Sequence, residues 1–500
     1  MYRIFSSKYY SMAAFAVFGL TSFINPLVAQ RRVTSIDDEI EILTRGPVHE
    51  AFAETIVFDP KPGIVIPRSP PAAIEELPPQ HQPVGDNIAW ISGYWAWDDD
   101  REDFIWISGI WRALPPDRQW IPGYWAPAIN GAQWTSGYWA DANSEEIEYL
   151  PEPPATVEAG PNVPAPSADH SWLPGSWIWQ RNAYAWRPGY WAPGQEDWNW
   201  IPARYVWTPR GYVFVNGFFD YNVSRRGVLY APVYIRSSVY TQQSFRYSPV
   251  TVINPSVFTN HLFLRPSYGH YYFGDYYSAN YATQGFSPWF SFHSQNAGYD
   301  PFYAQQRWQH RTDQQWKQRM VSEYTRRRNQ ETNRPPRDLR SQGERLARGG
   351  TGTDDSFRVG TTLEELIQVK ALPHRIQPLD SDTIQQLGKR SVEMRALNEQ
   401  RLKLESGVGG HTGGQPDSEA TPVRTRIPRS PIVGSPIQKL APGKAPPKII
   451  PVPMADPKIR PKPRPPQADK EHSPVRGKGN DGEGRGKGGK GVDKGKKDPS

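Results

Sequence analysis

Residues 119–141 read QWIPGYWAPAINGAQWTSGYWAD and contain one six-residue phrase twice, WIPGYW from Trp120 and WTSGYW from Trp134. Each phrase places two tryptophans five positions apart around a glycine. In one regular strand an offset of five sends the two side chains to opposite faces, and on a helix they diverge by about 140°. The backbone must therefore change direction inside the phrase.

The phrase WxxGxW recurs through the first half of the chain, mostly at steps of 14 residues. It forms a first block over 88–142 and a second over 171–220, separated by a proline-rich insert over 143–170. The last two copies are altered, because Ala203 replaces a glycine and Phe214 a tryptophan. We assign a structural role to the repeated residues, which are Trp90, Gly93, Trp95, Trp106, Gly109, Trp111, Trp120, Gly123, Trp125, Trp134, Gly137, Trp139, Trp172, Gly175, Trp177, Trp186, Gly189 and Trp191.

Polar segments with turn chemistry, such as Asn130-Gly131 and Arg181-Asn182, separate the phrases. Short aromatic stretches at this spacing, without helical periodicity, are typical of strands. The sequence predicts a mainly β fold: an antiparallel meander of short aromatic strands, followed by one or two helices and a long disordered tail.

The centre of each phrase is nearly always Ser-Gly or Pro-Gly, and two arrangements fit it. In one, the dipeptide is a tight hairpin turn that pairs Trp120 directly with Trp125. In the other, it is a bulge or kink inside a longer strand. We favour the kink, because Pro-Gly prefers type II turns and two-residue hairpins prefer the primed types. In either arrangement we expect an aromatic ring of the next strand to lie on each bare glycine.

The phrases WISGYW, WIPGYW, WTSGYW and WRPGYW resemble the bacterial YXWGXW (WXXGXW) repeat family of exported proteins. The resemblance covers about residues 90–219. It implies export, but no established biochemical activity and no catalytic residues.

The start of the chain reads as a signal peptide over 1–29, with a basic beginning, an apolar stretch from Met12 to Ile24 and a small-residue cleavage site at Leu27-Val28-Ala29. The apolar stretch is shorter than the roughly 20 residues of a spanning helix, so we expect no transmembrane helix in the mature chain. We expect the protein in the periplasm, the cell envelope or the extracellular space. It has no cysteine, so packing and hydrogen bonds must hold it together.

The other segments are assigned by composition and pattern. They are a proline-rich leader or linker over 30–87, a Tyr/Phe-rich β extension over 221–303, a helix over 304–333, a charged linker over 334–404 with a helix at about 382–404, and a disordered basic tail over 405–500.

Basic charge concentrates in the last 60 residues, where 15 Lys or Arg face 7 Asp or Glu, leaving a net −1 on the other 440. A near-neutral body argues against specific nucleic-acid binding. The tail is either a solubilising extension or a tether to anionic polymers.

No linear signature of a hydrolase, nucleotide or metal site is present, so we expect no catalytic residue, metal or cofactor. The acidic run over 98–103 lacks an EF-hand arrangement and is interpreted as a solvated loop rather than a calcium site. One alternative is an exported hydrolase with a site in 261–300, built from His261, His270, Asp275, His293 and Asp300.

The leading hypothesis is an exported, non-enzymatic scaffold or interaction module whose partner is an unknown protein or an envelope polysaccharide. A second hypothesis is glycan binding through exposed aromatic rings. The best candidates for ligand contact are the tryptophans outside the repeat positions, Trp97, Trp179 and Trp207.

Overall fold

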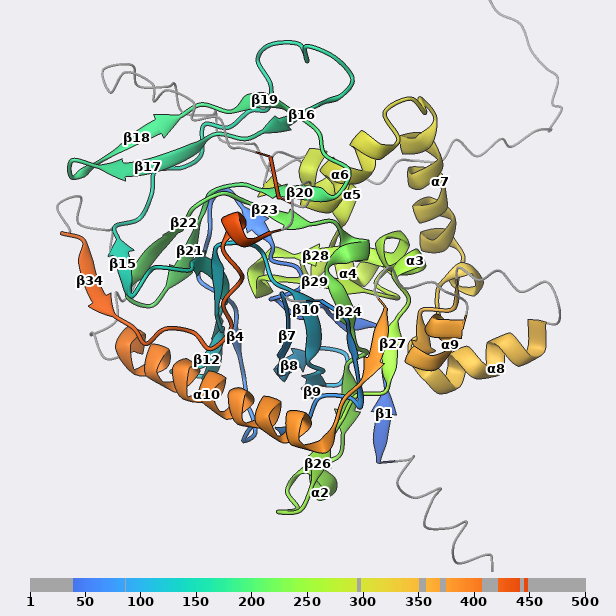
Figure 1. Ribbon diagram of the computed structural model, residues 1–500. Helices are drawn as coiled ribbons and strands as arrows, with labels where there is room; N and C mark the ends of the chain where they lie inside the picture. The colour runs from blue at the N-terminus through green and yellow to red at the C-terminus, as the bar shows by residue number, and fades with distance from the viewer. Residues whose placement is uncertain are drawn as a thin grey trace, which may run out of the picture.

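The computed structural model describes residues 39–85, 87–294, 298–349, 357–368, 375–406, 421–440 and 445–447. The predicted signal peptide and most of the predicted tail lie outside these residues. The body is mainly β, built from small and mostly antiparallel sheets, with helices around its periphery (Figure 1).

Eight copies of the phrase form four hairpins, each made from two consecutive copies. The first hairpin is β7 (Ile88–Ile91), β8 (Tyr94–Asp98), β9 (Asp103–Ile107) and β10 (Ile110–Ala113). The second is β11 (Arg118–Ile121), β12 (Tyr124–Ala128), β13 (Gly131–Thr135) and β14 (Tyr138–Asp141). The third is β16 (His170–Leu173), β17 (Ser176–Gln180), β18 (Ala183–Arg187) and β19 (Tyr190–Pro193). The fourth is β20 (Trp198–Ile201), β21 (Arg204–Thr208), β22 (Gly211–Val215) and β23 (Phe218–Tyr221).

The centre of each phrase is a kink in a long strand, and the hairpin turn lies between two phrases. In the second hairpin, β12 pairs with β13 and β11 pairs with β14, so Trp125 faces Trp134 and Trp120 faces Trp139. Trp120 and Trp125 belong to the two halves of one kinked strand and do not pair with each other. The same pairing recurs in all four hairpins, and the centroids of the eight facing ring pairs lie 5.0 to 5.5 Å apart.

The glycines at the kinks are required by close approach, as expected. A Cβ at Gly123 would lie 2.5 Å from Cζ2 of Trp134, and one at Gly137 would lie 2.6 Å from Cζ2 of Trp120. The first tryptophan of each phrase thus lies on the glycine of the other. In the fourth hairpin Trp200 covers its glycine in the same way.

Further strands of the described residues extend or join the hairpins. Those of the leader are β1 (Ile40–Ile42), β2 (Gly46–Pro47), β3 (Ile56–Val57), β4 (Val65–Ile66), β5 (Glu75–Glu76) and β6 (His81–Pro83). The insert forms β15 (Glu146–Leu150). The Tyr/Phe-rich segment forms β24 (Gly227–Leu229), β25 (Val233–Ile235), β26 (Arg246–Tyr247), β27 (Thr251–Ile253), β28 (Leu262–Arg265), β29 (His270–Phe273), β30 (Ser287–Pro288) and β31 (Gly298–Tyr299). Four-stranded sheets have the orders β1-β25-β9-β8, β21-β22-β15-β34 and β2-β29-β28-β30, where β34 is Val423–Arg426. The leader therefore lies against the body.

The helices follow two patterns. Short ones connect strands: α2 (Ser237–Tyr240), α3 (Pro255–Phe258), α4 (Ala279–Thr283), α5 (Trp289–Ser294) and α9 (Leu363–Gln368). Longer ones lie outside the sheets: α6 (Pro301–Gln309), α7 (Trp316–Asn329), α8 (Leu339–Gly349) and α10 (Ser381–Ser406). The helix predicted over 304–333 is thus two helices, because the Asp313 carboxylate accepts the Gln315 N–H (3.1 Å) and forms a turn between them.

Two other predictions need correction. The charged linker over 334–404 also contains α8, α9, β32 (Gly360–Thr362) and β33 (Ile376–Pro378). Part of the predicted disordered tail is ordered, because β34 (Val423–Arg426) pairs with β15 and Ile432 is buried beside the second hairpin. The pairing of β34 with β15 and the burial of Ile427 and Ile432 hold residues 421–440 in place, although their composition predicts disorder.

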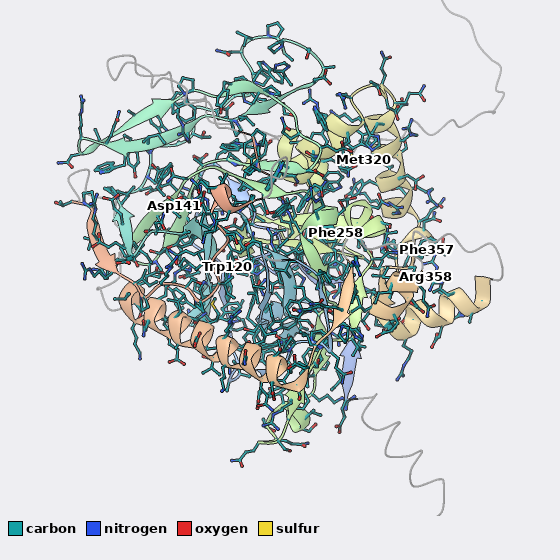
Figure 2. All side chains as sticks on the ribbon, in the orientation of Figure 1. Trp120, Asp141, Phe258, Met320, Phe357 and Arg358 are labelled. Carbon is teal, nitrogen blue, oxygen red and sulfur yellow. The ribbon has the colours of Figure 1, made fainter. Side chains whose placement is uncertain are left out.

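The main hydrophobic core lies where the first, second and fourth hairpins meet α10 and the sheet around β28 and β29. Trp120 is 2% exposed and lies in the interior of the molecule above α10 (Figure 2). The same core includes Leu397 of the helix and Phe273 of β29.

We expect Gly123→Ala to lower the free energy of unfolding by about 1–3 kcal/mol, because the new methyl group would overlap the Trp134 ring. Denaturant unfolding followed by circular dichroism measures the change. Gly343→Ala is the control, since it lies exposed in α8 with no atom within 4 Å of the new Cβ. That change should instead stabilise by about 0.5–1 kcal/mol. Equal effects at both sites would contradict the ring-on-glycine explanation.

Candidate functional site

Each kink interrupts the ladder between its two strands and leaves backbone polar groups without a cross-strand partner. Buried groups of this kind need hydrogen bonds from elsewhere. In three of the four hairpins a glutamate from outside the hairpin supplies them. These glutamates are Glu76 for the first hairpin, Glu50 for the second and Glu158 for the third.

Glu76 shows the arrangement most fully. Its carboxylate accepts the N–H of Gly93 (2.5 Å) and of Gly109 (2.8 Å), which lie at the kinks of the two long strands of the first hairpin. It also accepts the indole N–H of Trp106 (3.1 Å). The ring that covers a glycine therefore also donates to the carboxylate.

The other two glutamates use a tryptophan and the glycine three positions after it. Glu50 accepts from Trp134 Nε1 and from Gly137 N, both at 2.9 Å. Glu158 accepts from Trp172 Nε1 at 3.1 Å and from Gly175 N at 2.5 Å. All three carboxylates complete the fold of the repeat.

Carbonyl groups at the two kinks of the second hairpin accept hydrogen bonds from an arginine. Arg401 of α10 donates to the carbonyl oxygens of Pro122 (2.8 Å) and Ser136 (2.9 Å) and is paired with Glu405 (2.9 Å). Glu405 in turn accepts the hydroxyl of Tyr124 (2.6 Å). The helix is thereby attached to the kink by buried polar contacts.

Burial changes the acidity of these carboxylates. It raises the pKa of Glu50 and of Glu76 to about 7, although the N–H donors at each kink favour the ionised form. Both groups are at least 98% buried. A raised pKa in a cavity is also a feature of catalytic acids, so the surroundings of Glu50 decide its role.

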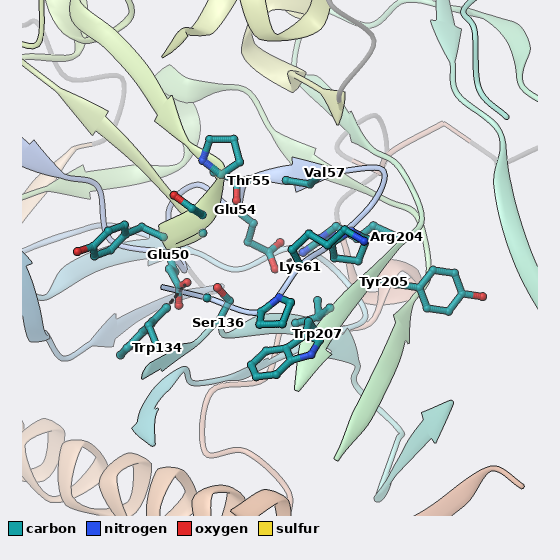
Figure 3. Close-up of a pocket in the computed structure, with 18 of the residues that line it drawn as sticks. Glu50, Glu54, Thr55, Val57, Lys61, Trp134, Ser136, Arg204, Tyr205 and Trp207 are labelled. Carbon is teal, nitrogen blue, oxygen red and sulfur yellow. Dashed lines mark hydrogen bonds and ion pairs between the residues drawn. The ribbon is translucent and has the colours of Figure 1, made fainter. Parts of the chain in front are cut away.

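Glu50 borders a cavity of about 250 Å³ between the second and fourth hairpins (Figure 3). Trp134 and Ser136 lie on the Glu50 side, and Arg204 and Trp207 approach from the fourth hairpin. The remaining wall comes from the leader over 54–63 and from residues 266–269.

Glu54, another carboxylate that lines this cavity, is bound to neighbouring groups of the protein. Glu54 forms a buried ion pair with Arg204 and accepts the N–H of Trp139 (3.2 Å). Burial raises the pKa of Glu54, while Arg204 opposes that rise. The pair joins the leader to both hairpins.

His270 lies beside Glu50, with Nε2 3.9 Å from its Oε1, but it does not act as a free base. Its Nδ1 is 2.6 Å from the carbonyl oxygen of Tyr268 and must donate to it. Nε2 therefore accepts the hydroxyl of Tyr94 (2.9 Å), whose oxygen accepts the N–H of Glu50 (3.0 Å). Burial lowers the pKa of His270 to about 4, so the ring is neutral at pH 7.

The described residues of the hydrolase alternative are each engaged in contacts of their own. His261 is buried with Nδ1 2.9 Å from the Tyr277 hydroxyl, and Asp300 caps α6 by accepting the N–H of Tyr303 (2.8 Å). Asp275 forms an ion pair with Arg337 (3.5 Å). The side chain of His293 lies outside the described residues.

The acidic run over 98–103 forms ion pairs and is not simply a solvated loop. Asp98 and Asp100 contact Arg45 at 3.4 and 2.7 Å, and Asp99 pairs with Arg265. Within the described parts of the chain, no cluster of three or more His, Asp or Glu residues is arranged to hold a metal ion. The arginines of this network lie far away in the sequence.

The three candidate ligand tryptophans have different surroundings. Trp97 is 4% exposed and packs against Phe104, so it offers no ring face to a ligand. Trp179 is half-buried beside Tyr184 on the third hairpin. Trp207 is half-buried and lines the Glu50 cavity.

Equivalent repeat tryptophans also differ in exposure. Those of the first two hairpins are buried, except for the half-buried Trp125. All those of the third hairpin are half-buried: Trp172, Trp177, Trp186 and Trp191. Figure 1 shows this hairpin along the upper edge of the molecule, and its strands pair with no other described strand.

Sequence reasoning missed the three kink glutamates. Each lies in a proline-rich segment, at VHEAF, AIEEL and TVEAG. Glu76 and Glu158 each lie 17 residues before the first kink glycine of their hairpin, Gly93 and Gly175, whereas Glu50 lies 87 residues before Gly137. In two of the three segments an apolar residue comes directly before the acidic residues, Ile74 before Glu75-Glu76 and Val157 before Glu158. Many surface glutamates share that feature. The shared 17-residue spacing is the signal that the sequence offers for Glu76 and Glu158, and only the fold places Glu50 at its kink.

Comparison with known families identifies a WXXGXW repeat region in this chain. The model of the WXXGXW repeat (2 copies) matches residues 89–112, 120–140, 169–192 and 196–217. Each match therefore falls on one kinked hairpin, and the last ends before β23. No curated protein and no solved structure matches the chain. In the described part, no helix has both the length and the apolar character needed to cross a membrane.

We expect the destabilisation caused by Glu76→Gln to depend on pH. The folded protein holds the Glu76 proton up to about pH 7, whereas the ordinary carboxyl group loses it near pH 4.5. The wild type therefore loses stability relative to the variant as the pH rises between these values. The difference in unfolding free energy should be largest at pH 4.5 or below and smallest above pH 7.

Chemical unfolding at pH 4, 5, 6, 7 and 8 measures this difference. Glu75→Gln is the matched control, because Glu75 is the exposed neighbour of Glu76 and pairs only with Arg246 at the surface. Its effect should be small across the range. A Glu76→Gln effect that grew with pH would mean that the ionised carboxylate is favoured in the fold.

Proposed function

We propose that this chain is an exported, non-enzymatic interaction module of the cell envelope. In this proposal the first, second and fourth hairpins form a rigid body, and the third hairpin is a binding arm. The observation that carries it is that all four repeat tryptophans of the third hairpin are half-buried, whereas seven of the eight in the first two hairpins are buried. A ring buried in the first two hairpins serves packing, whereas its half-buried equivalent in the third remains open to a partner.

The engagement of the carboxylates supports a non-enzymatic role. Glu50 borders the cavity, yet Glu76 has the same donors and the same raised pKa without lining that cavity. The raised pKa of Glu50 therefore follows from its place in the repeat. A general acid needs a free path to the substrate proton, and Glu50 is held by two N–H donors.

We expect the purified mature chain to cosediment with isolated cell-wall polysaccharide and to leave it chemically unchanged. Sedimentation measures the binding, and mass spectrometry with a reducing-end assay measures the polysaccharide after incubation. Heat-denatured protein is the control for nonspecific adhesion. Release of new reducing ends would contradict the non-enzymatic part, and absence of sedimentation would contradict the choice of partner.

Glycan recognition in the Glu50 cavity is a second candidate. The half-buried ring of Trp207 and the Glu54–Arg204 pair offer one apolar surface and fixed polar groups, which is the usual make-up of a sugar site. Proline rings and Tyr268 complete an apolar wall. The cavity is large enough for about one sugar ring.

For this candidate we expect Trp207→Ala to weaken the binding of a neutral oligosaccharide by about fivefold, since a lost ring contact costs roughly 1 kcal/mol. Intrinsic fluorescence titration or calorimetry measures the affinity. Trp179→Ala is matched to it, because that ring is also half-buried and lies away from the cavity. Equal losses in both variants would place the sugar elsewhere.

A further inference from the structure

A second, larger cavity lies between the third hairpin and the helices α6 and α7. It measures about 500 Å³ and is bordered by β16 and β19 on one side and by residues 303–317 on the other. Figure 1 shows α6 beside the β16 end of the hairpin. We call this cavity the arm groove.

Aromatic rings from both sides line the arm groove. Trp172 and Trp191 face each other across the hairpin at 5.5 Å, with ring planes 70° apart. From the helices come Trp308 and Trp316, and the latter stacks on His310 at 5.3 Å. These four indoles are half-buried, so each has an accessible part.

The two sides of the groove are joined by specific contacts. Trp308 lies on Gly194, where a Cβ would come within 2.1 Å of its Nε1, and donates to the carbonyl oxygen of Asp169 (3.0 Å). Arg311 pairs with the Asp169 carboxylate (2.6 Å). The ring-on-glycine contact of the repeats is thus used again, between a helix and the end of a hairpin.

The helix side of the groove is strongly cationic. Residues 301–329 contain seven Lys or Arg and two Asp or Glu, a net charge of +5 that the near-neutral total of the body conceals. Arg307 and Lys317 line the groove, are exposed, and form no ion pair with a described residue. Asp313, the acidic residue of the lining, is paired with Arg319.

We infer that the arm groove binds an acidic polysaccharide, with sugar rings against the indoles and carboxylates on Arg307 and Lys317. A cavity of this volume accommodates about two sugar units of a chain that enters and leaves it. The inference rests on the proposed function, because it names the partner class and the surface of the binding arm.

The ring geometry favours a sugar chain over single-stranded nucleic acid. Bases bind to a series of platforms on which they stack in succession. Here the two indoles of the hairpin are inclined by 70°, so they do not form a flat platform on which bases stack in succession. A pyranose ring presents C–H groups on its faces and hydroxyls around its edge, so it binds to a single indole face without needing a second parallel one.

The test measures binding of an oligomer of glucuronic acid to the mature chain by calorimetry. Its carboxyl-reduced, neutral counterpart and an oligothymidylate of similar length are the comparison ligands. Arg307→Gln combined with Lys317→Gln removes two exposed charges of the groove. Arg326→Gln combined with Arg328→Gln is the matched control, because both side chains are exposed on α7 and lie outside the groove lining.

We expect the groove variant to bind the acidic oligomer about tenfold more weakly than the wild type, and the control variant to bind it nearly as well. The acidic oligomer should bind more tightly than its neutral counterpart, by a factor that falls as salt is added. Trp191→Ala should weaken both sugar ligands.

Three results would overturn the inference: equal affinity for the neutral and acidic oligomers, equal losses in the two charge variants, or tighter binding of oligothymidylate. Wild-type protein that sediments with cell-wall polysaccharide but fails any of these comparisons would leave the proposed function standing. Protein that binds no saccharide and no cell-wall material would remove both.

Discussion

The fold depends on satisfying the backbone where a strand is bent. A kink opens the ladder between two strands and leaves N–H and C=O groups inside an apolar interior, where an unsatisfied group is costly. Glycine allows the two strands to approach and an indole to cover them, and Glu76 then binds both glycine N–H groups. A kinked hairpin is therefore completed only by a segment from elsewhere in the chain.

This requirement explains the proline-rich segments. The leader over 39–85 supplies glutamates to the first two hairpins, and the insert supplies Glu158 to the third. Proline keeps such a segment extended and removes N–H donors of its own, so it can lie on a sheet without competing for partners. Segments with a linker-like composition are thus structural parts of the repeat domain.

One local unit also acquires different uses from its surroundings. The first and second hairpins are enclosed by the leader, the core and α10, whereas the third contacts the body along part of its surface. The tryptophans of the third hairpin occupy the same positions in the repeat as those of the first two, but they remain half-buried. A buried carboxylate with a raised pKa is likewise explained by its place in the unit, as the comparison of Glu50 with Glu76 demonstrates.

The sequence by itself determined the repeat: its 14-residue step, the strands, the turns between phrases, the kink, and the ring on each glycine. These features follow from short-range sterics, because glycine, proline and paired aromatic residues act on their immediate neighbours. Only the tertiary structure decided which glutamates enter the kinks, that residues 421–440 are ordered, that Trp97 is buried, and that α6 and α7 form a cationic groove with the third hairpin. Most of those outcomes depend on contacts between segments far apart in the sequence, such as Asn87 with Ser435 at a separation of 348 residues, and local composition carries no record of them.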